Sequence, residues 1–312
     1  MIEKTSPHET KSRYAFATFL AGSDSEIDST EDNYFIATRI LTYQLLHAPE
    51  TKSKDTSTPF IVLVTDRVPE WQRIRLRRDG ATVIHAPYLN ASWINAAIPG
   101  WDQVLTKLRL WELTEFERIC FLDADTQLTA PLDGVFVDQA VATQVTNTSS
   151  TNIQADEASL PSTFVFAGVP EMKQVHHYPP AANGSDFPNP NYLNAGFFVF
   201  APDVKMLEYY KSIMRIPDRF DSSMPEQNLL NYAHRREEGD DHHGGGGGGG
   251  AMPWQTLANT WNIHYPTMDD VRGGVVAIHE KWWAAPNGDL GVWMRGWRWR
   301  MEGFYEGRDL KV

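Results

Sequence analysis

The stretch ICFLDADTQL, residues 119–128, decides which kind of sheet this chain builds. Residues 119–122 are all apolar, which is typical of a short strand that is buried on both faces. Asp123 and Asp125 end that run abruptly, and two carboxylates so close to a core are costly unless water or a cation pairs with them. The stretch therefore predicts a buried strand whose carboxyl end opens onto a polar site.

Strand-like and helix-like segments alternate along the chain. Strands are expected at residues 14–20, 59–66, 81–87, 118–122, 191–202 and 273–283. The segments between them carry apolar residues at helical spacing, such as Val104, Leu108 and Trp111. This alternation favours an α/β fold with a mostly parallel central sheet and helices on both faces. In such sheets ligands bind at the carboxyl ends of the strands.

The length of 312 residues allows one large α/β domain or two modest ones. Apolar residues make up 42% and charged residues 22%, which is ordinary for a globular protein. One domain over residues 13–312 is the expected division. Residues 1–12 are expected to form a disordered tail, residues 142–190 an irregular excursion, and residues 237–252 a mobile glycine-rich loop. The single cysteine, Cys120, excludes an intramolecular disulfide.

Charge and hydropathy exclude several classes of function. A formal net charge of −12 argues against a general affinity for nucleic acid or for anionic membranes. No apolar run approaches the roughly 18 residues of a membrane span. The first residues also lack the apolar region of a signal peptide. We therefore expect a cytoplasmic protein without a membrane span.

Three interpretations of the aspartate pair are open at this point. A magnesium or manganese ion would relieve the repulsion between the two carboxylates. Alternatively, the two side chains are solvated and close an Asx-turn. In the third interpretation, DADT matches the Asp-x-Asp-x-Thr pattern of haloacid-dehalogenase-like phosphatases, with Asp123 as nucleophile, Asp125 as acid/base and Asp269 and Asp270 as the downstream acidic pair. That pattern belongs on the first strand of its domain, whereas at least three predicted strands precede it here.

Seven segments, in a fixed order, carry a resemblance to a known family. They are TFLAG (18–22), LTKLRLWEL (105–113), FLDADTQL (121–128), YLNAGFFVF (192–200), PEQNLLN (225–231), TWN (260–262) and VAIHEKWW (276–283). Together they resemble glycosyltransferase family 8, the family of glycogenin and galactinol synthase, and they are most similar to the galactinol synthase branch. The resemblance implies a GT-A-type single domain and the retaining transfer of a hexose from a UDP-sugar, with Mn²⁺ or Mg²⁺ as cofactor.

The resemblance also implies a metal site. Asp123, Asp125 and His279 match the family's ligands, which hold a metal against the diphosphate. From the residues alone, His279 could equally be a half-buried histidine bonded to the backbone. Lys107 matches a lysine near the donor sugar, and its alternative is a stem along apolar surface with the amine in water.

Four residues are implied to lie near the transferred sugar. Glu226 and Gln227 match residues close to the anomeric carbon, although Ser223 and Glu226 also have the spacing of a helix capping box. Asn194 is implied to hydrogen-bond donor hydroxyls, and Gly196 to let the backbone approach the donor closely.

The nucleotide is implied to contact a further group of residues. They are Phe19, Leu20, Ala21, Tyr34, Asp123, Ala124, Asp125, Gly196 and Lys281. Tyr34 would stack on the uracil, and its alternative is a core tyrosine. Lys281 would bind phosphate, although HEKWW is shorter than the family's segment, which carries Gly and then Lys-Pro-Trp.

Donor sugar and acceptor are the least specified. Galactose, glucose and N-acetylglucosamine are the candidate sugars, and the acceptor is a small polyol such as myo-inositol or a glycan. By analogy with glycogenin, the acceptor could instead be a tyrosine of the chain itself, Tyr265. A sugar-nucleotide-binding scaffold without activity is the non-enzymatic alternative, and a homodimer is also considered. The tail VWMRGWRWRMEGFY, residues 292–305, is expected to pack its tryptophans and expose its arginines.

Overall fold

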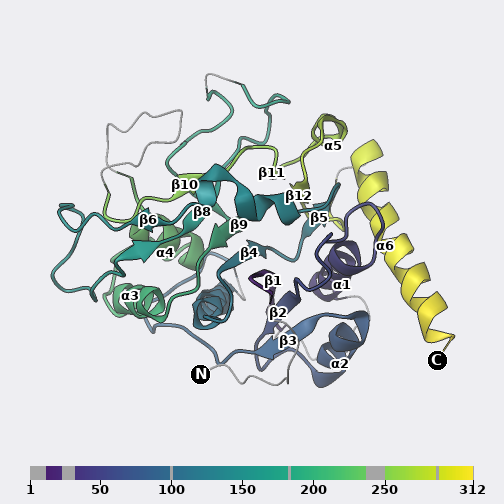
Figure 1. The fold of residues 1–312 in the computed structure, drawn as a ribbon, viewed down its shortest axis with the longest axis horizontal. Coiled ribbons are helices and arrows are strands. Elements are labelled where there is room, and N and C mark those ends of the chain that lie inside the picture. Colours follow the sequence, from purple (N-terminus) through teal and green to yellow (C-terminus); the bar gives the residue numbers. More distant parts are fainter. Residues whose placement is uncertain are drawn as a thin grey trace.

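The computed structural model describes residues 12–22, 32–98, 101–181, 184–236, 250–285 and 288–311. Within these residues, seven strands form a central sheet in the order β10–β8–β9–β4–β1–β2–β3 (Figure 1). Their bounds are β1 Tyr14–Leu20, β2 Phe60–Val64, β3 Thr82–His85, β4 Arg118–Leu122, β8 Phe166–Pro170, β9 Leu193–Phe200 and β10 Gln255–Thr256. Two small sheets consist of β11 Asn262–His264, β12 Ala277–His279 and β5 Thr126–Leu128, and of β6 Gln144–Val145 and β7 Thr163–Phe164.

The central sheet is mostly parallel, as predicted. Strands β3, β2, β1 and β4 run parallel to one another, and β9 is antiparallel to both of its neighbours, β4 and β8. The register places Phe16 beside Cys120, and Leu122 opposite Phe197. This is the α/β arrangement expected for a GT-A-type fold.

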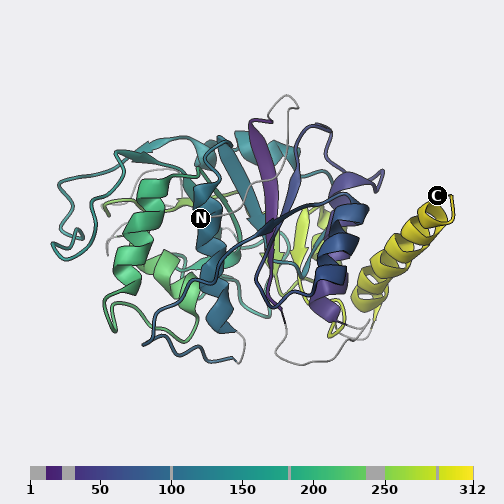
Figure 2. The same ribbon diagram turned by 90° about the horizontal axis from the view of Figure 1, so that it is seen from below.

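Helices cover both faces of the sheet (Figure 2). Their bounds are α1 Asn33–Leu46, α2 Glu70–Asp79, α3 Val204–Met214, α4 Pro225–Ala233, α5 Met268–Gly273 and α6 Asp289–Asp309, with 3₁₀ helices η1 Trp101–Glu112, η2 Asp133–Val137 and η3 Gln139–Val141. Helix η1 packs with α3 and α4 on one face, whereas α1 covers the other and carries α6 on its outside. Strand β1 serves both layers, because Ala17 and Phe19 belong to the first core cluster and Phe16 and Leu20 to the second.

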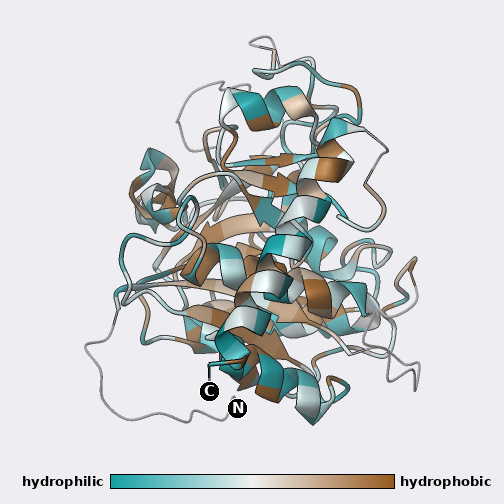
Figure 3. Ribbon diagram, turned by 90° about the vertical axis from the view of Figure 1, so that its right-hand side faces the viewer, coloured by the Kyte–Doolittle hydropathy of each residue, from teal (hydrophilic) through white to brown (hydrophobic). Residues whose placement is uncertain are grey.

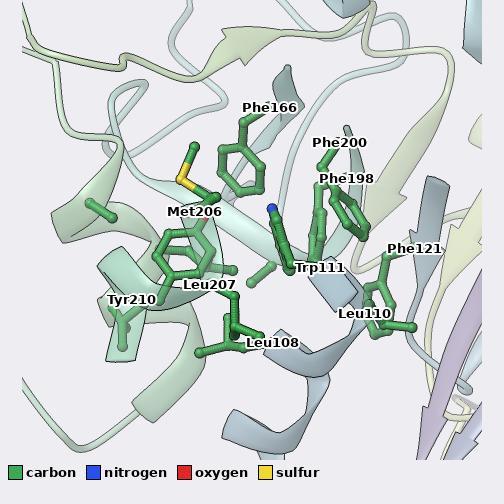
Figure 4. Packing of buried hydrophobic residues seen from close by; sticks show 14 of the residues in the cluster. Leu108, Leu110, Trp111, Phe121, Phe166, Phe198, Phe200, Met206, Leu207 and Tyr210 are labelled. Atoms are coloured by element: carbon green, nitrogen blue, oxygen red, sulfur yellow. The ribbon is translucent and has the colours of Figure 1, made fainter. Parts of the chain in front are cut away.

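Trp111 lies at the centre of the larger core cluster (Figure 4). Its ring stacks on Phe200 with 3.9 Å between centroids and meets Tyr210 edge-on at 5.1 Å. Such contacts join η1 to β9 and α3, and aromatic pairs of this kind add to the stability that burial alone provides. The position of η1 against the sheet therefore depends on this ring.

The segment that precedes β4 differs from its prediction in helix type. Spacing of Val104, Leu108 and Trp111 predicted an α-helix, but the structure has a twelve-residue 3₁₀ helix, η1. Leu105, Leu108 and Trp111 are all buried, at every third residue. That period matches the three residues per turn of a 3₁₀ helix, so tertiary packing of this edge overrides the usual preference for an α-helix.

Two predicted boundaries also change. The segment at residues 142–190, predicted to be irregular, contributes β8 to the central sheet beside β9. The last predicted strand, at residues 273–283, shrinks to β12, which pairs with β11 and β5 outside the central sheet. Residues 1–11 of the predicted tail and residues 237–249 of the predicted glycine-rich loop lie outside the described residues. The division into one domain with a tail stays a prediction.

We predict that Trp111→Ala lowers the free energy of unfolding by about 3–5 kcal/mol, because it removes the ring from a filled core. Val137→Ala is the control, because Val137 is 77% exposed and should change stability by less than about 0.5 kcal/mol. Urea denaturation followed by circular dichroism measures both. Equal midpoints for Trp111→Ala and the parent would contradict the role assigned to this ring.

Candidate functional site

The site begins where β4 ends. Asp123 follows the strand directly, and its backbone N–H donates to the carbonyl of Gly196 on β9 at 2.8 Å. The N–H of Thr126 donates to the carbonyl of Asp123 at 3.0 Å, which turns the chain into β5. Strand β5 pairs with β12 so that Thr126 lies opposite His279. Strand pairing thus brings His279 to the aspartates.

Three side chains form a candidate metal centre. One ligand atom from each of Asp123, Asp125 and His279 lies within 4.8 Å of the other two. His279 Nε2 is 3.2 Å from Asp125 Oδ1 and 3.9 Å from Asp123 Oδ2. Two carboxylates and one imidazole suit manganese or magnesium, so these residues fit the predicted ion.

Backbone space at Gly196 is part of this centre. A Cβ at residue 196 would lie 2.2 Å from Cε1 of His279. Only a glycine therefore leaves room for the imidazole at its present position. The approach of a donor to Gly196 stays a prediction. The close contact that the structure shows at Gly196 is with the imidazole of His279.

Burial and charge act in opposite directions on His279. Burial alone would lower its pKa, but the carboxylates of Asp125 and Asp123 outweigh burial and raise the pKa to about 9. Burial would raise the pKa of Asp125, and His279 and Lys281 lower it instead. His279 Nδ1 is buried without a hydrogen-bond partner among the described residues. The alternative of a backbone-bonded histidine is wrong, because His279 Nε2 faces Asp125 and Nδ1 has no partner among the described residues. Asp125 is buried whereas Asp123 is partly exposed, so the alternative in which both aspartates are solvated fails at Asp125.

Lys107 bridges two acidic residues. Its Nζ donates to Asp123 Oδ1 at 2.8 Å and to Glu226 Oε1 at 2.7 Å. The residue is only 5% exposed, so the alternative with the amine in water is wrong. Burial would lower the pKa of Lys107, but the two carboxylates raise it above its usual value. The ammonium also lies 5.0 Å from the centroid of the Phe121 ring.

The predicted capping box is not formed. Helix α4 has Met224 as its N-cap, with no side-chain cap bond and with Pro225 in the first turn. Ser223 instead bonds to Asp221 through both its backbone N–H and its hydroxyl. Because Lys107 neutralises Glu226, the Glu226 carboxylate is held inside the site.

Gln227 and Asn194 are fixed by their neighbours. Gln227 Oε1 accepts from the backbone N–H of Ala195 at 2.9 Å, and its Nε2 donates to the hydroxyl of Tyr192 at 3.1 Å. Asn194 Oδ1 accepts from the N–H of Gly196 at 2.9 Å. These side chains therefore lie at the start of β9, next to the aspartates at the end of β4.

Two polar residues of this cluster, Glu171 and His264, were missed by the sequence analysis. Glu171 Oε1 lies 2.6 Å from His264 Nδ1, and Glu171 Oε2 accepts from Asn194 at 2.8 Å. The His264 ring stacks on His279 with 5.0 Å between centroids. Glu171 follows β8 in the segment predicted to be irregular, and His264 comes two residues after the TWN motif. Proximity to that motif was the available signal for His264, and the apolar run before Glu171 was the signal for β8.

The residues implied for the nucleotide fall into two groups. Phe19 and Leu20 are buried in β1, and Ala21 is partly buried just after it. Tyr34 is 41% exposed and meets Trp283 edge-on at 4.9 Å, so the core-tyrosine alternative is wrong. Burial and the negative charges of Asp125 and Asp123 raise the pKa of Tyr34.

Ala124 and Lys281 complete this side of the site. Ala124 is 5% exposed, between the two aspartates. Lys281 is partly buried and lies two residues after His279, and its positive charge helps to lower the pKa of Asp125. Nucleotide contact by either residue stays a prediction.

Comparison with known proteins finds sequence relatives and solved structures of similar fold. No protein-family model matches the chain. An uncharacterised protein of Schizosaccharomyces pombe is 29% identical over 299 residues, covering 88% of this chain and 73% of that protein. Galactinol synthase 4 of Arabidopsis thaliana is 24% identical over 227 residues, covering 72% of this chain and 61% of the plant protein. The solved structure of the galactosyltransferase LgtC with donor and acceptor sugar analogues is 12% identical, with a TM-score of 0.46 and coverage of 93% and 95%.

The sequence matches confirm the predicted similarity to family 8 glycosyltransferases. Three galactinol synthases match at 24–28% identity. The chain spans 61%, 50% and 59% of their lengths, so their complete activity is carried over only as a proposal. Within the described ranges, no helix combines the length and apolarity needed to cross a bilayer.

We predict that the metal-free protein loses stability as the pH rises from about 6.5 to about 9. The folded pKa of His279 is raised, so the folded state binds more protons than the unfolded state in this window, and the stabilisation is complete below it. Chemical denaturation in EDTA at several pH values measures the effect. His279→Asn should flatten the profile above pH 6.5, and an unchanged slope in that variant would contradict the assignment.

We predict that Lys107→Met destabilises the metal-free protein by about 3–5 kcal/mol, because two acidic residues lose their buried counter-ion. Manganese should restore part of the melting temperature, since a cation between the aspartates would offset their charge. Lys205→Met on the exposed surface of α3 is the matched control. Thermal melting with EDTA and with manganese compares the variants, and equal melting temperatures for Lys107→Met and Lys205→Met would refute the prediction.

Proposed function

We propose that this chain is a metal-dependent, retaining glycosyltransferase that moves a hexose from a UDP-sugar to a hydroxyl of a small polyol. One observation carries the proposal: Asp123, Asp125 and His279 converge at the carboxyl end of β4. Lys107 and Glu226 form a buried ion pair beside them. The sequence similarity to galactinol synthases supports the reaction class.

Asp123, Asp125 and His279 would hold the ion, manganese or magnesium. When bound, the ion would supply positive charge to the diphosphate of the donor and so stabilise UDP as it departs. Lys281 is the proposed second cation for the diphosphate. It lies two residues after His279, and its positive charge contributes to the lowered pKa of Asp125.

The remaining residues act on the sugar. In the proposed reaction the bond from the anomeric carbon to the UDP oxygen breaks, and both electrons leave with UDP. The acceptor oxygen bonds to the anomeric carbon on the same face, and its proton passes to the departing phosphate oxygen. Glu226 and the Gln227 amide stabilise the positive charge that develops on the sugar. Lys107 holds Glu226 and Asp123 in position.

The similarity to galactinol synthases supports the proposed donor and acceptor. Galactose is the proposed sugar, with glucose and N-acetylglucosamine as alternatives, because galactinol synthases are among the relatives. Myo-inositol is the proposed acceptor for the same reason. Asn194, held by Glu171 and the backbone of Gly196, is the proposed partner of the donor hydroxyls.

The first experiment measures UDP release from UDP-galactose, UDP-glucose and UDP-N-acetylglucosamine, with manganese or EDTA and with or without myo-inositol. We expect release with one donor, stimulation by the polyol, and a loss of at least about a hundredfold in Asp125→Ala. Mass spectrometry of the product identifies the acceptor and would reveal a sugar on Tyr265 instead. The Lys205→Met variant should retain full activity.

Other outcomes would overturn the proposal. UDP binding without turnover on any donor would favour a scaffold. Phosphate release from a simple ester such as p-nitrophenyl phosphate, lost in Asp123→Asn, would favour the phosphatase. The structure already weakens the phosphatase, because Asp270 is bound in the capping box of α5 with Thr267. Asp123 also follows the fourth strand of the chain, not the first.

A further inference from the structure

Helix α6 lies along the outside of the molecule (Figures 1 and 3). Its inner face is well anchored, because Trp297, Met301 and Tyr305 are buried in one cluster with residues of α1. Arg308 near its end also pairs with the buried carboxylate of Asp79 at 3.4 Å. The helix is therefore a fixed part of the fold, and its outer face has a defined shape.

Three apolar side chains are exposed along the outer side of α6. Val292 is 59% exposed, Trp299 62%, and Leu310, the C-cap residue after the helix, 88%. These residues are separated by seven and eleven positions, so they lie on one line along an α-helix. Trp299 was expected to pack on the domain together with the other tryptophans of the tail, and that expectation is wrong: Trp297 packs and Trp299 does not.

Glycines occupy the same side of the helix. Gly296, Gly303 and Gly307 each have open space where a Cβ would lie, with no described atom within 4 Å. Each glycine costs a helix about 1 kcal/mol relative to alanine. Nothing within the described chain uses the space that these glycines leave. Helices that approach each other closely do use such space, because a side chain of one fits over the backbone of the other.

We infer that α6 forms the contact of a twofold-symmetric homodimer, with the two copies of the helix antiparallel. In an antiparallel pair centred on Met301, Trp299 faces Gly303 of the second copy, because one precedes and the other follows the centre by two residues. Val292 faces Leu310 in the same way, nine residues on either side. The large exposed side chain thus meets a glycine, and the two exposed aliphatic side chains meet each other. One surface complements itself, as a twofold interface requires.

The charges on α6 agree with the same arrangement. Arg295 and Glu306 flank the apolar line on one side and are six and five residues from its centre. No ion pair within the described chain is recorded for either of them. Across the twofold axis, Arg295 of each copy would lie next to Glu306 of the other. A parallel pair would instead bring like charges together, so charge complementarity selects the antiparallel dimer.

The expected dimer is weak. A helix of 21 residues is about 30 Å long, and one helix pair is at the low end of specific interfaces. Dissociation constants on the order of micromolar are expected for such a contact. Sedimentation velocity over a concentration series is therefore the appropriate measurement, with the full chain.

The first test replaces the central side chain. Trp299→Ser should raise the dimer dissociation constant at least about tenfold, because a buried aromatic anchor is lost. Val137→Ser removes an equally exposed apolar side chain from η2 and should leave the constant unchanged. Both positions are exposed, so both variants should keep the melting temperature of the monomer.

The second test exchanges charges. Arg295→Glu alone and Glu306→Arg alone should each weaken the homodimer, because each places like charges together twice. An equimolar mixture of the two variants should recover dimerisation as a heterodimer, since opposite charges then meet at both ends. Only an interface that pairs residue 295 with residue 306 across a twofold axis gives this recovery.

Three results would overturn the inference. They are a parent chain that stays monomeric throughout the series, a dimer that Trp299→Ser does not weaken, and a mixture of the charge variants that fails to recover. Monomeric chain that sediments with phosphatidylserine vesicles through Trp299 would assign this face to a lipid surface instead. UDP-sugar turnover is measured separately, so the result does not depend on the proposed function.

Discussion

Repulsion between two carboxylates at the end of a buried strand governs the architecture around it. Asp123 and Asp125 follow β4 at the boundary of the core, where Asp125 is buried and Asp123 only partly exposed, so water screens their repulsion weakly. Each carboxylate is paired with one cationic side chain. Lys107 pairs with Asp123, and the imidazole of His279 pairs with Asp125. Lys107 comes from η1, the element just before β4, whereas His279 comes from β12, more than 150 residues further along the chain. Packing of η1 and pairing of β12 with β5 therefore serve one electrostatic requirement.

The same requirement explains a chain of secondary contacts. Besides its hydrogen bond to Asp123, the ammonium group of Lys107 donates a second one to Glu226. His279 is stacked on His264, which is bound by Glu171. Glu171 in turn holds Asn194. These polar groups are buried or partly buried and each contacts the next, so the line links β12, β11, β8 and β9 around the site.

Sequence reasoning predicted the elements whose signals are local. The apolar runs of β1, β2, β4 and β9 identify strands because each is bounded by polar or turn residues. Asp123 and Asp125 identify the site because their position at a strand end is itself a local feature. The helix type of η1 could not be predicted, because a period of three becomes visible only when its buried edge is known. Strand β8 was hidden inside a segment whose composition is typical of loops.

The contacts of the site divide in the same way. Residue types were enough to select Lys107, Glu226 and Gln227 through the family resemblance, but not to find their partners. The spacing of Ser223 and Glu226 predicted a local cap, and a long-range ion pair with Lys107 replaced it. Glu171 and His264 carry no motif, and they meet only because β8 and β11 are brought together by folding. Contacts between residues this far apart in the sequence cannot be predicted from either segment alone.

Pairing of β5 with β12 also has a consequence for how the chain folds. Asp125 precedes β5, whereas His279 arrives on a strand near the other end of the domain, so the loop between them must close before the three ligands meet. Closing so long a loop is entropically unfavourable until the core contacts that compensate for it have formed. A nascent or truncated chain that ends before β12 would carry both aspartates and still lack the third ligand. The candidate ligand set is thus complete only once β12 has paired with β5, and metal binding by these three residues would indicate that the pairing has formed.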